Sequence, residues 1–228
     1  MIIAIDGPSG AGKSTLGRLL ARELGLLYID TGAMYRAAAL AVIEAGVSTA
    51  DEAAVARVVR GADINLAGDP DSLQVMLAGR DVSREIRSEE VSHTASVISA
   101  IPEVRRTLVA RQREMGERAG GVVLDGRDIG TVVFPGADVK FFLTAAPEAR
   151  AHRRYEEDRV KERDATFEET LAEINTRDRR DTTREDSPLA AAPDAVRLDS
   201  TELSIEEVFG RMLEVIREKG GGKRVEAS

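Results

Sequence analysis

Residues 7–14 constrain the fold of this chain more than any other segment. They read Gly-Pro-Ser-Gly-Ala-Gly-Lys-Ser and match the phosphate-binding pattern G-x-x-x-x-G-K-[ST] at every fixed position. Residues 2–5 form a short apolar run rich in β-branched side chains, which predicts a buried strand. Leucines recur at helical spacing over residues 13–24, and Gly25 follows as a stop signal. The motif therefore lies between a predicted strand and a predicted helix, the context in which it binds phosphate.

The residue types of this loop explain how it would bind a nucleotide. Its glycines let successive backbone N–H groups converge on phosphate oxygens, and the following helix contributes the partial positive charge of its N-terminus. We expect Lys13 to reach the β- and γ-phosphates and the Ser14 hydroxyl to ligate Mg²⁺. The other predicted nucleotide contacts in the loop are Gly7, Pro8, Ser9, Gly10, Ala11, Gly12 and Thr15. An ordinary glycine-rich turn is the structural alternative, but the Lys-Ser pair between the flanking elements favours phosphate binding.

The order of the predicted elements indicates an α/β fold. A second apolar run at 26–30 and a second helix at 34–45 follow the first strand and helix, and this alternation predicts a parallel sheet flanked by helices. Further strands of the same sheet are predicted at 122–125, 139–143 and 195–198. Three short segments within residues 63–82, separated by turn residues, predict a small antiparallel meander inserted into this core.

We expect a single domain over residues 1–228, because a chain of this length can bury a sizeable core. Its predicted parts are a core of about 1–35, 100–150 and 186–219, a substrate-binding region of about 36–99 that contains the meander at 63–82, a helical lid of about 150–185, and a tail of 220–228. The tail is rich in glycine and polar residues and has no core to join, so we expect it to be disordered.

The charge balance excludes several classes of protein. The chain has 32 Lys and Arg against 40 Asp and Glu, a net charge of −8, so it lacks the overall positive field of a protein that binds nucleic-acid polymers. No stretch approaches the ~20 apolar residues that a membrane span requires. The absence of cysteine excludes disulfides and thiolate metal sites. We therefore expect a soluble cytoplasmic protein with neither a nucleic-acid polymer nor a membrane as its partner.

Two polar clusters follow predicted strands. Residues 30–36 stand where the second strand passes into the second helix, and residues 125–131 follow the third strand of the sheet. Because the carboxyl ends of parallel strands meet at one edge of a sheet, both clusters would lie beside the phosphate loop. Arg36 suits an acceptor phosphate, while Arg127 and Asp128 suit a phosphate and a donor group on a base or sugar. For either cluster alone a salt-bridged loop explains the residues equally well, whereas the two together favour a binding site.

The segment 150–184 is highly charged but locally neutral, with ten cations and ten carboxylates. Within it Arg177, Asp181 and Arg184 stand at i, i+4 and i+7, which predicts that they share one helix face. A solvated surface with ion pairs accounts for most such charged runs. In an enzyme that transfers phosphate, however, arginine-rich helices are expected to form a lid that excludes water and neutralises charge.

The phosphate loop alone does not identify the phosphate acceptor. A regulatory GTPase would need an Asn-Lys-x-Asp motif, and neither Asn65 nor Asn175 precedes a lysine. A transporter-type ATPase would carry a Ser-Gly-Gly signature, which is also absent. The small-molecule kinases are the class that remains.

Taken together, the phosphate loop, residues 30–36, the meander, residues 125–135 and the arginine-rich lid resemble the bacterial cytidylate kinases. The similarity extends over about residues 2–219, and residues 125–135 are far more specific than the loop, which all P-loop kinases share. The resemblance implies a P-loop kinase fold and transfer of the γ-phosphate of ATP to CMP or dCMP, with Mg²⁺ required. It also implies that region 36–99 binds CMP and that the meander enlarges this subdomain.

The resemblance further implies roles for individual residues. The implied contacts are Ser96, Arg105 and Asp128 with cytosine; Thr31, Tyr35, Arg36 and Arg127 with the acceptor pocket and its phosphate; Arg177 and Asp181 with ribose; Arg184 with the phosphates; and Arg153 near the ATP base.

A CMP phosphate is already anionic at neutral pH, so the transfer needs no general base. Catalysis would then depend on alignment and charge, with Lys13, Arg127 and Arg184 as the catalytic residues. Asp125, at the end of a strand, joins Ser14 as a predicted ligand of Mg²⁺ or its waters. We expect a monomer. Two alternatives stay open: another nucleoside monophosphate or small-hydroxyl kinase, and a regulatory module that holds ATP without transferring phosphate.

Overall fold

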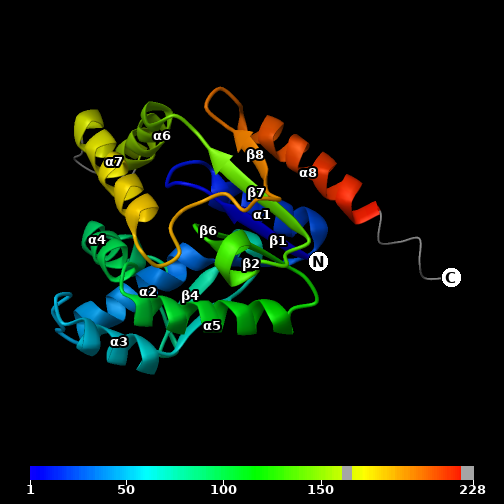
Figure 1. The fold of residues 1–228 in the computed structure, drawn as a ribbon. Coiled ribbons are helices and arrows are strands. Elements are labelled where there is room, and N and C mark those ends of the chain that lie inside the picture. The colour runs from blue at the N-terminus through cyan, green and yellow to red at the C-terminus, as the bar shows by residue number, and fades with distance from the viewer. Residues whose placement is uncertain (161–165, 222–228) are drawn as a thin grey trace.

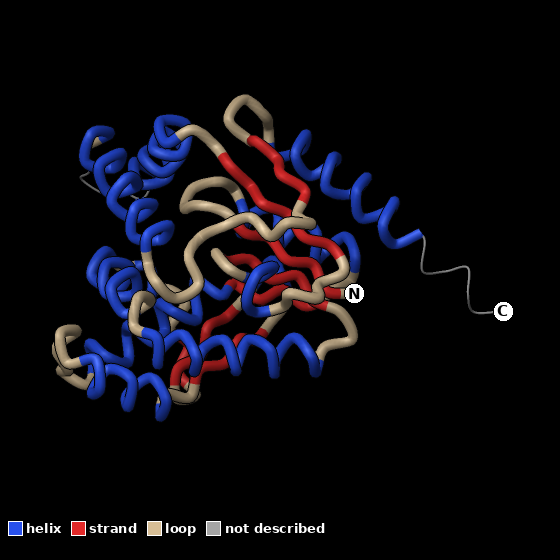
Figure 2. The backbone as a smooth tube through the Cα atoms, in the orientation of Figure 1, coloured by secondary structure: helices blue, strands red, loops and turns tan. Residues whose placement is uncertain are grey.

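The computed structural model describes residues 1–160 and 166–221 and has a parallel five-stranded sheet at its centre (Figures 1 and 2). The strand order is β2-β6-β1-β7-β8, and every neighbouring pair is parallel. The strands are β1 (Ile2–Asp6), β2 (Leu27–Asp30), β6 (Val122–Gly126), β7 (Val139–Thr144) and β8 (Val196–Asp199). Because β1 lies in the middle, the loop that leaves its carboxyl end is flanked by the ends of β6 and β7.

Helices cover both faces of this sheet because its strands send alternate side chains to opposite sides. Ile3 and Ile5 belong to one core cluster with α1 (Lys13–Leu24) and α8 (Ile205–Gly221). Ala4 belongs to the other cluster, with α2 (Thr31–Glu44), α3 (Glu52–Gly61), α4 (Glu89–Ile98) and α5 (Pro102–Arg118). The predicted α/β architecture with a central parallel sheet is therefore confirmed.

Helix α2 begins three residues earlier than the predicted start at residue 34. The carboxylate of Asp30 accepts the backbone N–H of Ala33 at 2.7 Å and caps the helix at Thr31. The polar cluster that follows β2 is therefore helical from its second residue. As a result, Thr31, Tyr35 and Arg36 are held on a rigid element directly beside the phosphate loop.

The predicted meander is present as a three-stranded antiparallel sheet. Its strands are β3 (Ile64–Ala67), β4 (Gln74–Leu77) and β5 (Arg80–Asp81), in the order β3-β4-β5. Buried apolar side chains from this small sheet, including Ile64, Val75 and Leu77, belong to the same core cluster as α2. The meander thus packs against α2, the helix that carries residues 31–36 of the first polar cluster.

The arginine-rich segment folds into α6 (Pro147–Val160) and α7 (Phe167–Thr183), which pack against each other (Figure 1). Thr166 and Glu169 form a capping box at the start of α7. The prediction that Arg184 belongs to the same helix is wrong. The helix ends at Thr183, and Arg184 is its C-cap with extended backbone (φ −63°, ψ 141°).

The C-terminal helix α8 extends beyond residue 219, where the predicted core ends. It begins after Ser204, whose hydroxyl accepts the backbone N–H of Glu207 at 3.2 Å, and it extends through Gly221. Residues 220 and 221 are therefore helical, contrary to the predicted start of a disordered tail at 220, because glycine weakens a helix by only about 1 kcal/mol per residue and does not exclude it. The remainder of that predicted tail, residues 222–228, lies outside the described residues.

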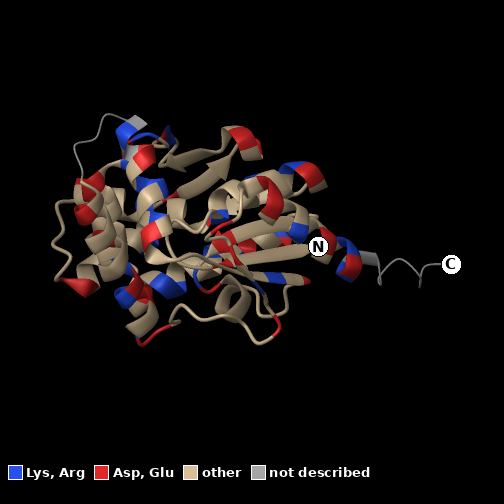
Figure 3. Cartoon of the chain, turned by 90° about the horizontal axis from the view of Figure 1, so that it is seen from above, with Lys and Arg blue, Asp and Glu red and all other residues tan. Residues whose placement is uncertain are grey.

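Figure 3 shows Lys and Arg positions interleaved with Asp and Glu positions along the helices. This distribution agrees with the locally neutral composition of the lid segment in the sequence. In residues 1–160 and 166–221, no helix combines the length and the apolar character that a membrane crossing requires.

Candidate active site

The phosphate loop follows β1 along a path that only glycine permits at its first position. Gly7 has φ 149°, and a Cβ built there would lie 2.1 Å from the backbone oxygen of Leu143 in β7. Gly10 and Gly12 also have positive φ, at 76° and 90°. The turn therefore combines close approach to the neighbouring strand with left-handed backbone, which explains the glycine pattern of the motif.

Lys13, the first residue of α1, lies at the bottom of this loop. Its ammonium donates a hydrogen bond to the backbone oxygen of Pro8 at 2.6 Å, and the residue is only 6% exposed. Burial, followed by repulsion from Arg127, lowers the pKa of Lys13 well below its ordinary range. The charges of Asp125 and Asp181 favour the charged ammonium but do not offset its burial, and a phosphate oxygen of a ligand would supply further negative charge.

Ser14 and Asp125 form an oxygen pair next to Lys13. The Ser14 hydroxyl donates to Asp125 Oδ2 at 2.9 Å, and the Tyr28 hydroxyl donates to Oδ1 at 2.7 Å. Burial, together with repulsion from Asp30, raises the pKa of Asp125 to about 6. One hydroxyl and one carboxylate suit Mg²⁺, which binds through few protein oxygens plus substrate phosphates and water. In the described part of the chain, no group of three or more His, Asp or Glu side chains could hold a metal ion.

A cavity of about 660 Å³ opens in front of the loop, between the start of α2, α4, the end of β6, α7 and the start of α8. It is lined by all ten predicted substrate-binding residues: Thr31, Tyr35, Arg36, Ser96, Arg105, Arg127, Asp128, Arg177, Asp181 and Arg184. From the predicted nucleotide and metal sites it is lined by Ser9, Gly10, Gly12, Lys13, Ser14, Thr15, Asp125 and Arg153. Gly7, Pro8 and Ala11 shape the loop without lining the cavity. The predicted site residues are thus brought together.

Ion pairs join elements across the predicted acceptor side of this cavity, which consists of the ten predicted substrate-binding residues. Arg127 donates through Nε to Asp181 Oδ2 at 2.7 Å, which joins the end of β6 to α7. Asp128 points elsewhere, because its carboxylate pairs with Arg105 of α5 and lies 3.7 Å from Nη2 of Arg184. Arg127 and Asp128 are neighbours in the sequence, but they contact two different walls of the cavity.

Several buried polar atoms on this side have no hydrogen-bond partner within the described residues. They are the Tyr35 hydroxyl, Nε of Arg36, Nε of Arg105 and Nη2 of Arg184. Buried polar groups are almost always paired in folded proteins, so these atoms indicate a ligand that supplies the missing acceptors. Arg153, which the resemblance places near the ATP base, donates from Nη1 to Ser200 Oγ at 3.2 Å.

Comparison with known proteins agrees with this geometry. The family model for cytidylate kinase matches residues 3–218. The chain belongs to the cytidylate kinase family. It is 52% identical over 219 residues to the cytidylate kinase of Geobacter sp. (strain M21), covering 96% of this chain and 94% of that protein. It is 49% identical over 221 residues to the cytidylate kinase of Rhodococcus opacus (strain B4), covering 97% and 96%. Membership in this family of kinases implies ATP as the phosphate donor.

The fold is also similar to that of a kinase of known structure. The shikimate kinase from Bacteroides thetaiotaomicron superposes with a TM-score of 0.50 at 15% sequence identity, covering 95% of this chain and 98% of that one. A similarity at this level of identity shows a common fold alone. It confirms the predicted P-loop kinase fold of this cytidylate kinase family member.

Sequence reasoning missed two arginines that link the lid to the rest of the site. Arg180 donates to Ser96 Oγ at 2.6 Å, so the predicted cytosine contact of α4 is joined to α7. Arg150 forms a two-point ion pair with Asp178 at 3.1 and 2.6 Å and also donates to the backbone oxygen of Ser9 at 3.1 Å. Arg180 follows Arg177 by three residues, and this spacing could have indicated the shared face. No sequence signal marks Arg150.

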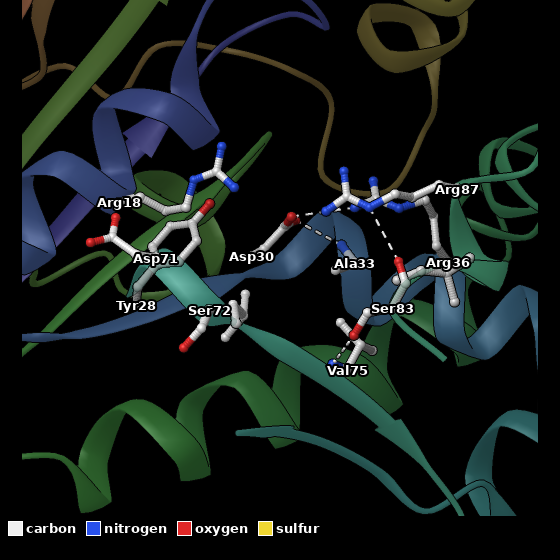
Figure 4. Close-up of a pocket in the computed structure, with 12 residues that line it drawn as sticks. Arg18, Tyr28, Asp30, Ala33, Arg36, Asp71, Ser72, Val75, Ser83 and Arg87 are labelled. Atoms are coloured by element: carbon white, nitrogen blue, oxygen red, sulfur yellow. Dashed lines mark hydrogen bonds and ion pairs between the residues drawn. The ribbon is translucent and has the colours of Figure 1, made fainter. Parts of the chain in front are cut away.

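Figure 4 shows a smaller cavity of about 110 Å³ between the core and the meander region. Arg36 and Arg87 both line this cavity; Arg36 pairs with Asp30 at 3.3 Å and Arg87 Nε donates to the backbone oxygen of Ser83 at 3.1 Å. Arg18, Asp30, Arg36 and Arg87 line both this cavity and the large one. The meander region therefore borders the acceptor side of the site.

Proposed function

We propose that this chain transfers the γ-phosphate of ATP to CMP or dCMP, giving ADP and CDP or dCDP. The observation that carries the proposal is an excess of buried positive charge around one cavity. Burial and repulsion from Arg127 lower the pKa of Arg177 to about 10, and burial with repulsion from Arg105 lowers the pKa of Arg184. Lys13 is affected in the same direction. The cavity lining has ten Lys and Arg side chains against six Asp and Glu, and this excess of cations suits a ligand with several phosphates.

On the donor side, the loop amides and Lys13 would hold the ATP phosphates. Lys13 would exchange the Pro8 carbonyl, now 2.6 Å away, for a phosphate oxygen. Ser14 and Asp125 would hold Mg²⁺, which when bound neutralises phosphate charge. Arg153, next to Ser200, would lie toward the ATP base.

On the acceptor side, the buried pair of Arg105 and Asp128 would read the edge of cytosine together with Ser96. A pocket that offers both donors and an acceptor suits the amino group, ring nitrogen and carbonyl of that base. Arg36 and Arg127 would bind the CMP phosphate, and the remaining acceptor contacts would come from Thr31, Tyr35, Arg177 and Asp181. Nε of Arg105 and Nε of Arg36 have no hydrogen-bond partner within the described residues, which supports this assignment.

In the transfer itself, an anionic oxygen of the CMP phosphate attacks the γ-phosphorus while the bond to the oxygen between the β- and γ-phosphorus breaks. No proton has to be removed from the acceptor, which fits the lack of a predicted general base. Lys13, Arg127 and Arg184 would stabilise the negative charge on the transferring group and keep donor and acceptor in line. The monomeric state and the cytoplasmic location stay predictions from the sequence.

An acceptor panel tests this proposal. Release of ADP is measured with CMP, dCMP, UMP, AMP and shikimate as acceptors, each with ATP and Mg²⁺. We expect the highest kcat/KM with CMP or dCMP. Turnover with AMP or shikimate but not with CMP or dCMP would show that a different kinase activity resides on this scaffold.

A further inference from the structure

Asp6 is the last residue of β1 and immediately precedes the phosphate loop, yet its carboxylate contacts the opposite side of the site. Its Oδ1 accepts the backbone N–H of Ile129 at 2.7 Å, and its Oδ2 accepts the backbone N–H of Gly130 at 2.7 Å. The residue is only 3% exposed. Both carboxylate oxygens of Asp6 therefore accept hydrogen bonds from the two residues that follow Asp128.

These two N–H groups begin the short π-helical turn Ile129–Val133. Groups in the first turn of a helix have no acceptor within the helix itself and must find one elsewhere. The carbonyl of Asp128 accepts from Val132 at 2.8 Å and from Val133 at 3.1 Å, so Asp128 is the N-cap of this turn. Asp6 thus fixes the turn at the point from which the Asp128 side chain projects.

The surroundings of Asp6 leave little room for this turn to move. A Cβ built on Gly130 would lie 3.3 Å from Asp6 Oδ2 and 3.1 Å from the side chain of Lys140. The Lys140 ammonium, however, is bonded to the Pro135 carbonyl at 2.6 Å and to Asp194 at 2.9 Å. In residues 1–160 and 166–221, no ion pair offsets the burial of Asp6. Burial raises its pKa to about 6, although the two amide hydrogen bonds act in the other direction.

A buried carboxylate that forms no ion pair is unfavourable for stability, and the charge of Lys13 only partly offsets the burial of Asp6, so a geometric role explains its presence better than a stabilising one. The groups that it positions are those that the acceptor side depends on. Asp128 holds Arg105, and Arg127, one residue earlier, holds Asp181. Displacement of this turn would move both pairs, while the backbone of the phosphate loop makes none of these contacts.

We propose that Asp6 is a positioning residue for the acceptor nucleotide, which fixes Asp128 and Arg127 through the amides of Ile129 and Gly130. This inference rests on the proposed function, because it assumes that Asp128 and Arg127 bind the acceptor. It assigns Asp6 to the acceptor side, although Asp6 adjoins the phosphate-binding motif in the sequence. A residue directly before the phosphate loop would otherwise be assigned to the binding of ATP.

The Asp6→Asn variant tests the inference because it keeps the size of the side chain but replaces one acceptor oxygen with an NH₂ group. One buried backbone N–H is then left without a partner. We expect KM and Kd for CMP to rise about tenfold or more, from the known penalty of an unsatisfied buried group. The Kd for ATP should stay within about twofold, a difference too small to reflect a lost hydrogen bond.

Asp138→Asn is the matched control, because Asp138 Oδ2 also accepts a backbone N–H, that of Ile2 at the other end of β1, at 2.8 Å. Asp138 lies outside the cavity, so both nucleotide affinities should persist in this variant. Equal weakening of ATP and CMP by Asp6→Asn, weakening of ATP alone, or no change in either would overturn the inference. Wild-type turnover with CMP tests the proposed function separately.

If Asp6→Asn does not fold, hydrogen exchange in the wild type provides a second test. CMP should slow the exchange of the Ile129 and Gly130 amides more strongly than ATP does, because these amides belong to the acceptor side. A stronger effect of ATP on the same two amides would overturn the inference without any variant.

Discussion

The two sides of the cavity are built in different ways. The donor side is a continuous loop at residues 7–14 whose backbone amides and glycines form the site. The acceptor side consists of side chains from distant parts of the chain, joined by the pairs Arg105–Asp128 and Arg127–Asp181. A site made of backbone is encoded by a short motif, whereas a site made of paired side chains depends on the packing of the whole domain.

The carboxylates of the two sides differ in their electrostatics as well. On the donor side, Asp125 accepts from two hydroxyls, and burial raises its pKa to about 6. On the acceptor side, burial acts on Asp181 in the same direction, but the charge and hydrogen bond of Arg127, with Arg177 and Arg184, lower its pKa. A bound cation would therefore stabilise Asp125 on the donor side, whereas Asp181 on the acceptor side is already stabilised by neighbouring arginines.

The largest expected effect concerns the backbone of the donor side. Gly7→Ala places a Cβ 2.1 Å from the Leu143 carbonyl, at φ 149°. Since neither strand can move without disrupting the sheet, we expect a loss of stability above about 4 kcal/mol, measured by urea unfolding. Gly25→Ala is the control: it shares a positive φ of 64° but has open space, so it should cost only about 1 kcal/mol. Equal losses would contradict a steric origin.

The second expected effect concerns Lys13, the cation of the donor loop. Lys13→Met keeps the length of the side chain and removes its charge from the transferring phosphate. We expect kcat to fall about 1,000-fold, or about 4 kcal/mol, with the Kd for CMP changed less than about threefold. Steady-state kinetics and CMP titration check this result. The exposed Lys219→Met should leave both values unchanged, and a large loss of CMP affinity in Lys13→Met would contradict the division into two sides.

The third expected effect concerns the acceptor side and decides between an enzyme and an ATP-binding module. Arg184→Ala removes a buried cation next to Asp128. We expect the transfer rate to fall about 100-fold while the Kd for ATP stays within about twofold. Single-turnover kinetics and ATP titration measure the two quantities. Arg179→Ala, on the exposed face of α7, is the control. An unchanged rate in Arg184→Ala would remove this residue from the catalytic set.

The smallest expected effect tests the electrostatic difference through pH. With a pKa of about 6 instead of 3.8, folded Asp125 retains a proton that the unfolded chain releases between these values. The penalty of its charge is therefore fully present above pH 6 and disappears as the pH falls. Relative to Asp125→Asn, the free energy of unfolding of the wild type should rise by about 1 kcal/mol between pH 7 and pH 5.

Asp181 should show the opposite sign in the same experiment. Its pKa is lowered in the folded state, so its contribution is present above pH 3.8 and is lost as the pH falls below that value. Relative to Asp181→Asn, the wild type should therefore lose stability between pH 5 and pH 3. Urea unfolding at each pH measures both differences, and the same sign for both carboxylates would contradict the electrostatic comparison.

The elements of the fold follow from local patterns in the sequence wherever those patterns are strong. The phosphate loop, its strand and its helix are predicted to within a residue, and Thr166 with Glu169 marks the start of α7. The predicted start of α2 is wrong by three residues. Asp30 could cap a helix, since it is an Asp that precedes one, but it also ends a predicted strand, and the sequence does not decide between these two roles. Arg184 was assigned to α7 from spacing alone, although the helix ends one residue before it.

The resemblance to a known family supplied the roles of most individual site residues. The sequence patterns by themselves determined the α/β fold, the phosphate loop and the two polar clusters at residues 30–36 and 125–131. These follow from periodicity and short motifs, which act over a few residues. Only the tertiary structure decided which of these residues pair, such as Arg105 with Asp128, and that Asp6 contacts the acceptor loop 123 and 124 residues away. Such contacts depend on distances fixed by the packing of the sheet and its helices, and no local pattern in the chain encodes them.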